Sequence, residues 1–111
     1  MSLETLRGFA LDLPHAEEGT SCNNVVFKAG AKNFFFMGTK DDAMVLRFKL
    51  IDKIAQAEQL SEKSPDIYSV GPSGWATVRL PLAARFPAKR FQSWMRDSYR
   101  ALVPKKFQQR G

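Results

Sequence analysis

The sequence predicts one α+β domain built in two layers, with three helices packed on an antiparallel sheet. Apolar residues recur at helical spacing in three separate segments of the 111-residue chain. Between them, runs rich in β-branched and aromatic residues alternate with polar positions and are joined by turns that contain glycine. Strands joined by tight turns pair antiparallel, and one-sided alternation requires cover on one face. The expected order is helix, strands, helix, hairpin, helix, over residues 1–111 as a single domain.

The first third of the chain is expected to contain one helix and one hairpin. Residues 2–13 carry apolar side chains at helical spacing, and Pro14 ends the pattern. The polar segment 15–24 is expected to be a loop that leads to the sheet. Residues 25–38, VVFKAGAKNFFFMG, are typical of a hairpin that turns at Gly30. On its second arm, strict alternation places Phe34 and Phe36 on one face and Phe35 and Met37 on the other.

The remaining segments complete the sheet and its cover. Residues 43–49 alternate as a strand, residues 50–63 have the period of a second helix, and residues 67–81 form an expected second hairpin around a Gly71–Gly74 turn. Residues 87–103 read as one long helix. In the strand, Met44, Leu46 and Phe48 are expected to face the core, opposite Val45, Arg47 and Lys49. In the second helix, the expected inward residues are Leu50, Ile51, Ile54 and Ala57.

Composition indicates a protein of the cytoplasm with its own apolar core. Hydrophobic residues make up 44% of the chain and include nine Phe and two Trp. The single cysteine, Cys22, excludes an internal disulfide framework and suits a reducing compartment. No run approaches the roughly 18 apolar residues of a membrane span, and the first residues do not resemble a secretory signal. We therefore expect a cytoplasmic location and no membrane partner.

Positive charge is concentrated at the C-terminal end of the chain. The net charge is +6, but residues 1–78 carry eight Lys or Arg against ten Asp or Glu. Residues 79–111 carry nine Lys or Arg against the single acid Asp97. Such asymmetry is informative about partners and points to an anionic one.

The predicted helix at 87–103 has one apolar and one basic face. At 100° per residue, Lys89, Arg96 and Arg100 lie within about 40° of one another, and the apolar face lies opposite. Arg90 lies to the side, near Asp97. The segment 104–111 is expected to be a basic, mobile tail in which Lys105 and Lys106 extend the positive track. The expected buried face consists of Phe91, Trp94, Met95, Ser98 and Leu102.

The ordered set ALDLP, EEGTS, VVFKAGAKNFFFM, MVLRFKL, GWATVRL and WMRDSYRALVPKK resembles the MmcQ/YjbR family of small bacterial proteins. The resemblance covers nearly the whole chain, from about Leu6 to Lys106. That family has a frataxin-like arrangement described as a double-wing DNA-binding motif, with two hairpin wings beside a helix. The resemblance therefore implies this fold and contact with DNA.

The basic helix face and the resemblance together predict weak, salt-sensitive and mostly sequence-independent binding to double-stranded DNA. Cations on one helix face neutralise phosphates and release counterions, but nothing in the pattern predicts base readout. Trp75 and Arg79 share one side of their strand, where the indole can stack on a base or pack against a helix end. The predicted DNA-binding residues are Lys89, Arg96, Arg100, Lys105, Lys106, Arg79 and Trp75.

Three other classes of function have weaker support in the sequence. His15, Glu17, Glu18 and Cys22 contain potential metal ligands, but their spacing matches no zinc or iron pattern, so no metal or cofactor is expected. No catalytic motif occurs, so we expect no enzymatic activity and assign no catalytic residue. The alternative to DNA binding is a protein-interaction module or homodimer that uses the exposed sheet face, since the NFFFMG segment can present apolar groups on both sides.

Overall fold

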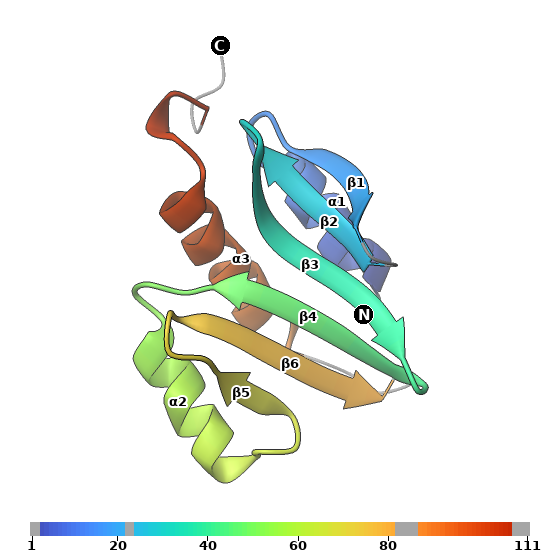
Figure 1. Cartoon of the computed structure of the whole chain (residues 1–111), viewed down its shortest axis with the longest axis vertical. Helices are drawn as coiled ribbons and strands as arrows, with labels where there is room; N and C mark the ends of the chain where they lie inside the picture. The colour runs from blue at the N-terminus through green and yellow to red at the C-terminus, as the bar shows by residue number, and fades with distance from the viewer. Residues whose placement is uncertain (1–2, 22–23, 82–86, 108–111) are drawn as a thin grey trace.

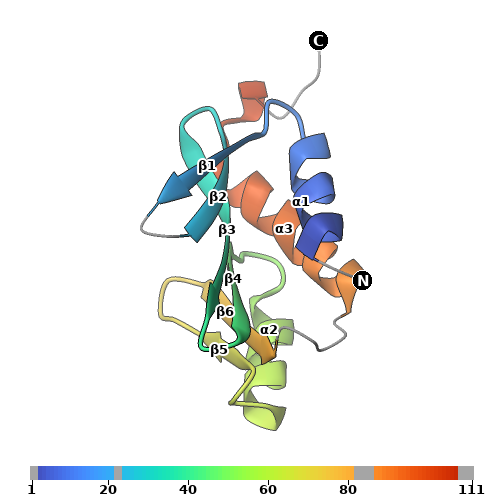
Figure 2. The same cartoon turned by 90° about the vertical axis from the view of Figure 1, so that its right-hand side faces the viewer.

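The computed structural model describes residues 3–21, 24–81 and 87–107 of the chain. Over these residues the strands form one six-stranded antiparallel sheet in the order β1-β2-β3-β4-β6-β5. The helices lie on one side of this sheet, as Figures 1 and 2 show, which confirms the two-layer α+β class. The elements are α1 (Leu3–Asp12), β1 (Glu17–Ser21), β2 (Asn24–Ala29), β3 (Lys32–Lys40), β4 (Ala43–Lys49), α2 (Ile54–Lys63), β5 (Tyr68–Val70), β6 (Trp75–Pro81), α3 (Ala88–Leu102) and a short 3-10 helix (Lys105–Phe107).

Aromatic rings between α3 and the central strands form the middle of the core. The Phe48 ring of β4 stacks on Phe35 of β3 at a centroid distance of 5.0 Å. On its helix side it lies 6.0 Å from Phe91 and 5.9 Å from Trp94. Trp94 is fully buried, and its indole Nε1 donates a hydrogen bond to Gln56 Oε1 of α2 at 2.8 Å. One side chain of α3 therefore contacts both the sheet and the second helix.

Alternation along β4 is confirmed, and it defines the two faces of the sheet. Met44, Leu46 and Phe48 are buried beneath the helices, whereas Arg47 is exposed on the other face. We call the face without helices the outer face. Because directly paired residues share a face, the register of β4 with β6 puts Thr77 opposite Arg47 and Arg79 opposite Val45.

Two expectations for the N-terminal half are wrong. The polar segment after Pro14 was expected to be a loop, but residues 17–21 form the edge strand β1, which pairs with β2 along its whole length. Strict alternation along β3 also fails, because the register shifts: Phe27 pairs with Phe35 and Lys28 with Asn33, which leaves Phe34 in a bulge. Phe34 therefore points to the core beside Phe35 and contacts the Tyr99 ring at 5.1 Å. Phe36, which was expected to share its face, lies on the outer face instead.

The second helix begins later than its apolar period suggests. It starts at Ile54, and Ile51 is 55% exposed, although Ile51 was expected to point inward. The reason is that the backbone N–H groups of residues 51–53 turn toward a carboxylate on α3, so these residues do not follow the helical period. Leu50 and Ala57 are buried as expected.

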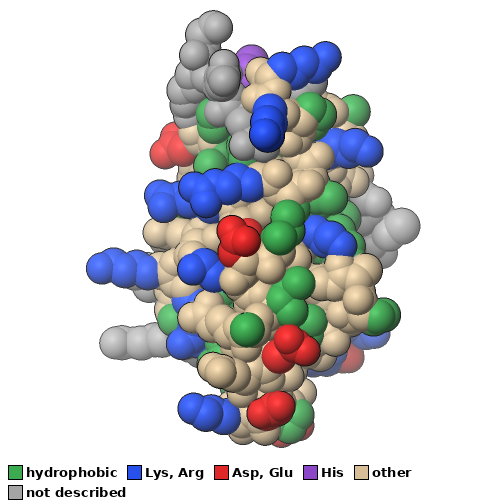
Figure 3. All heavy atoms as spheres, turned by 90° about the vertical axis from the view of Figure 1, so that its left-hand side faces the viewer, with side chains coloured by type: hydrophobic (Ala, Val, Ile, Leu, Met, Phe, Trp, Pro, Cys, Tyr) green, Lys and Arg blue, Asp and Glu red, His purple; other side chains and the backbone are tan. Residues whose placement is uncertain are grey.

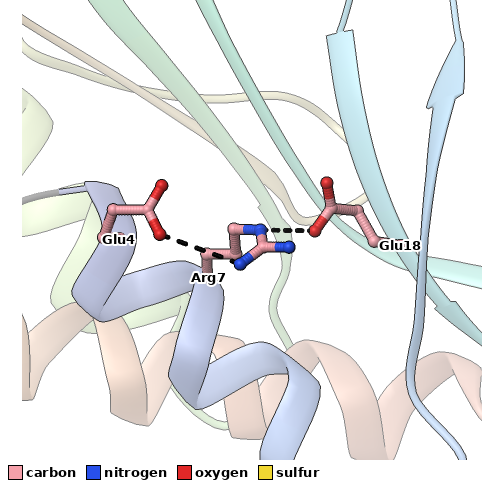
Figure 4. A network of polar contacts seen from close by, with 3 residues as sticks. All are labelled: Glu4, Arg7 and Glu18. Atoms are coloured by element: carbon pink, nitrogen blue, oxygen red, sulfur yellow. Dashed lines mark hydrogen bonds and ion pairs between the residues drawn. The ribbon is translucent and has the colours of Figure 1, made fainter.

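Helix α1 is held to the sheet by a polar contact from its middle and to α3 by one just after its C-terminal end. Arg7 Nε lies 2.5 Å from Glu18 Oε1 of β1, and Arg7 also pairs with Glu4 at 3.7 Å (Figure 4). At the C-terminal end of α1, the Tyr99 hydroxyl donates to the Pro14 carbonyl at 2.6 Å. These contacts place α1 against the side of α3, and the two helices pack together.

Candidate nucleic-acid interface

Helix α3 presents its cations to solvent and its apolar side to the sheet. Lys89, Arg96 and Arg100 are all exposed, and at 1.5 Å per residue they span about 16 Å of helix axis. We call these three residues the α3 basic face. The opposite side contains the expected buried residues Phe91, Trp94, Met95 and Ser98, with Leu102 partly buried.

The only acid of α3 is turned away from this basic face. Asp97 is 4% exposed, and its Oδ2 accepts hydrogen bonds from the backbone N–H groups of Ile51 at 2.7 Å, Asp52 at 3.0 Å and Lys53 at 3.1 Å. These are the amides just before α2, a helix whose own N-terminal residue provides no side-chain cap. The carboxylate thus stabilises the positive end of a neighbouring helix, where a negative charge is favoured.

Two of the α3 cations, Arg96 and Arg90, contact aromatic side chains. The Arg96 guanidinium carbon lies 5.1 Å from the centre of the Phe9 ring on α1, a cation–π contact that leaves Arg96 exposed. Arg90 lies to the side of the basic face, and its Nη1 donates to the Tyr68 hydroxyl of β5 at 2.9 Å. Arg90 therefore braces the helix against the sheet and is not part of the basic face.

The chain after α3 adds two more cations. Lys105 and Lys106 are exposed and lie in the short 3-10 helix, whereas residues 108–111 of the expected tail are outside the described part. Figure 3 shows blue side chains spread over this side of the molecule, with red ones near its centre, at its upper left and in its lower part. The basic surface of α3 therefore continues onto the 3-10 helix.

The structure separates the seven predicted residues into two groups. Trp75 and Arg79 lie on β6 with their side chains on the outer face, because Ala76, Val78 and Leu80 fill the core between them. Lys89, Arg96 and Arg100 lie on the helix side. The sheet stands between the two groups, so one ligand that lies flat on α3 does not reach Trp75.

Trp75 packs on another aromatic residue of the outer face and not on a helix end. Its ring centroid is 5.7 Å from that of Phe36, at an interplanar angle of 67°. Both side chains are half-buried, and Arg47 and Thr77 complete the surroundings of the pair. Arg79 lies farther along β6, where its Nη2 is 3.8 Å from Asp41 Oδ2 in the β3–β4 turn.

The candidate metal ligands of the N-terminal segment have structural roles where they are described. Glu18 binds Arg7, and Glu17 lies opposite Lys28 in the register of β1 with β2. Cys22 lies outside the described residues. In the described ranges, no three His, Cys, Asp or Glu side chains gather as a metal site.

Comparison of the sequence with models of protein families identifies its family. The model of the YjbR family matches residues 11–101. The chain belongs to the YjbR family. Among curated proteins, none matches this sequence.

A solved structure shows the same fold as this YjbR domain. It is the crystal structure of Deinococcus radiodurans protein DR2400, described as a DUF419 domain, with 24% sequence identity and a TM-score of 0.72. The likeness covers 96% of this chain and 81% of the DR2400 chain. At this identity the comparison supports the arrangement of helices and strands alone. Within the described residues, no helix has the length and apolar character needed to cross a membrane.

Two residues of the outer face were not among the predicted site residues of this YjbR domain. They are Phe36 and Arg47, which lie directly opposite each other on β3 and β4. The alternation of residues 43–49 already placed Arg47 away from the core. Phe36 could be assigned only once the bulge at Phe34 was known, because the bulge reverses the faces along the rest of the strand.

Proposed function

We propose that this YjbR domain is a non-enzymatic DNA-binding protein whose α3 basic face contacts the phosphates of a duplex. The observation that supports it is the position of Asp97. Because the one carboxylate of α3 is buried against the amides of α2, the exposed side of this helix carries only positive charge. A surface that serves solubility alone normally mixes both signs.

The contact that follows is electrostatic and largely independent of sequence. A helix length of about 16 Å corresponds to roughly five base-pair steps of a duplex, so several phosphates lie within reach of Lys89, Arg96 and Arg100. Lys105 and Lys106 extend this track beyond the helix. Phosphate contacts fix position and release counterions, and no side chain of the α3 basic face is arranged to read base edges.

The test is a salt titration of duplex binding by fluorescence anisotropy. Each phosphate contact contributes about −0.9 to the slope of log K against log salt. We expect Arg96→Gln and Arg100→Gln each to make the slope less negative by about 1, and the double variant by about 2. Arg96→Gln also removes the contact with Phe9, which costs only about 0.5–1 kcal/mol of stability at an exposed site.

Lys63→Gln is the matched control. Lys63 is exposed in the last turn of α2, at the opposite end of this helix from the amides that Asp97 caps. Its replacement removes the same unit of charge. We expect the slope of Lys63→Gln to equal that of the wild type. An equal loss in all three single variants would show attraction to net charge and no α3 site, and unchanged slopes in both arginine variants would refute the proposal.

The alternative, a homodimer joined through the outer sheet face, meets an electrostatic objection. Arg47, Lys49 and Arg79 all lie at outward positions of that face, so two copies placed face to face would bring like charges together. We therefore propose DNA over self-association as the function of the domain.

A further inference from the structure

The outer face of the sheet combines aromatic rings with a hollow between them. Phe36 and Trp75, from β3 and β6, meet above β4 in an edge-to-face contact with 5.7 Å between ring centres. Together with Arg47 and Thr77 they line an open depression of about 260 Å³. Two half-exposed aromatic rings on a sheet surface are not needed to fill the core, which lies on the other side.

A second hollow lies next to the first and shares two of its residues. It has a volume of about 150 Å³, and Phe36 and Arg47 line both hollows. Its other lining residues are mostly polar or small: Asn24, Gly38, Thr39 and Lys40, together with Val45 and Met37. The side-chain oxygen of Asn24 occupies the space above Gly38, where a larger residue would collide with it. An amide, a hydroxyl and an ammonium group therefore surround the second hollow.

Cations border both hollows on a face that is poor in carboxylates. The outward positions of β3, β4 and β6 contain no Asp or Glu and include Lys40, Arg47, Lys49 and Arg79. Lys49 donates from Nζ to the Ser73 carbonyl, and Arg79 pairs with Asp41 at the edge. Arg47, between the two hollows, forms no ion pair with any residue that the structure describes.

Flat rings, donors at the rim and a positive surround match the chemistry of an unpaired nucleotide. Every base offers a face that stacks on Phe or Trp, and its phosphate is attracted by neighbouring Lys and Arg. A duplex hides these faces inside its own stack, so it cannot use the aromatic pair. A protein partner with an apolar surface would have to bury the unpaired charge of Arg47, which is costly.

From this arrangement we infer that the outer face binds single-stranded nucleic acid, with successive bases in the two hollows on either side of Arg47. One base stacks in the Phe36–Trp75 hollow, and the next lies in the Asn24–Lys40 hollow. The guanidinium between them binds the linking phosphate. The two hollows are adjacent, since Phe36 and Arg47 line both of them. This site lies on the opposite side of the sheet from the α3 basic face and does not depend on the proposed duplex contact.

The experiment compares three labelled probes by fluorescence anisotropy at low salt: oligothymidylate, an abasic backbone of equal length, and a duplex of equal length. We expect oligothymidylate to bind at least severalfold more tightly than the abasic probe, because the two differ only in the bases. Trp75→Ala is expected to weaken oligothymidylate binding about tenfold and to leave duplex binding unchanged. Trp75→Phe keeps a ring and is expected to retain most of the affinity.

Two further measurements test the outer-face site and the α3 basic face independently of each other. The double variant Arg96→Gln, Arg100→Gln is expected to bind the duplex probe more weakly. It is expected to retain the higher affinity for oligothymidylate than for the abasic probe. In the wild type, stacking on Trp75 quenches tryptophan fluorescence, since Trp75 is accessible on the outer face and Trp94 is fully buried.

Three results would overturn the inference. They are equal binding of oligothymidylate and the abasic probe, unchanged oligothymidylate affinity in Trp75→Ala, and the absence of quenching at saturation. A dimer that Trp75→Ala dissociates, in a protein that does not bind oligothymidylate, would assign the outer face to a second copy of the chain instead.

Discussion

Removal of the Asp97 carboxylate tests the contact that joins α3 to α2. In Asp97→Ala the N–H groups of Ile51, Asp52 and Lys53 lose their shared acceptor, and the N-terminal end of α2 loses its negative charge. Hydrogen bonds to a charged group contribute about 1.5–3 kcal/mol, and a favourable helix-end charge adds about 0.3–1 kcal/mol. Ile51 and Asp52 are exposed, however, so water replaces part of what is lost.

We therefore expect Asp97→Ala to lower the free energy of unfolding by about 2–3 kcal/mol. Asp97→Asn keeps one carbonyl oxygen and should cost about 1 kcal/mol. With an unfolding entropy of about 2.1 cal/mol/K per residue, the alanine variant should melt about 10 °C below the wild type. Thermal unfolding followed by circular dichroism measures this difference.

Asp66→Ala is the matched control, because it removes an exposed carboxylate that follows α2. Its melting temperature should stay within about 2 °C of the wild type, as for most surface substitutions. If Asp97→Ala also melted within that range, the carboxylate would not be the cap of α2. The account of why the α3 basic face lacks negative charge would then be wrong.

Two further predictions concern the core and the turns. Trp94→Ala should lower the free energy of unfolding, measured in urea, by about 3–5 kcal/mol, because Trp94 is fully buried and contacts Phe48 and α2. Trp75→Ala should lower it by only about 1 kcal/mol. Similar urea midpoints for the two variants would contradict the assigned faces. Gly74→Ala should destabilise the domain, since Gly74 has φ +86° and a Cβ there would lie 2.7 Å from the Leu50 carbonyl oxygen. Gly8 lies inside α1 with open space around it, so Gly8→Ala should raise the free energy of unfolding by about 0.5–1 kcal/mol. If the melting temperature changed in the same direction in both glycine variants, this reasoning would be refuted.

Elements with one dominant period were predictable from the sequence. The faces of β4 and α3 follow directly from the spacing of their apolar residues, because each of these elements buries one side only. β1 was missed because its residues, EEGTS, lack apolar alternation. It is an edge strand, held by pairing with β2 and by the bond from Arg7 to Glu18. A local pattern does not record such a contact.

Contacts between elements that are far apart in the sequence were harder to predict. Asp97 reads as an ordinary charge on a helix surface, and only the path of the chain brings the start of α2 to it, more than forty positions away in the sequence. The position of Trp75 was within reach of sequence reasoning. Its neighbours Ala76 and Val78 are the apolar residues of β6, so Trp75 had to face away from the helices, and therefore away from Arg96.

Positive and negative side chains are more clearly separated in the folded structure than along the sequence. Residues 1–78 are slightly acidic in total, yet the outward positions of β3, β4 and β6 carry cations without carboxylates. The acids lie in other places: in the Glu4–Arg7–Glu18 group, at Asp12 at the end of α1, at Glu17 on the edge strand β1, in the β3–β4 turn, and along α2 and its ends at Asp52, Glu58, Glu62 and Asp66. A polyanion is therefore repelled from the end formed by α2 and attracted to both α3 and the outer face. We therefore propose that the two positive surfaces on opposite sides of the sheet bind different ligands, with phosphates alone on α3 and unpaired bases on the aromatic outer face.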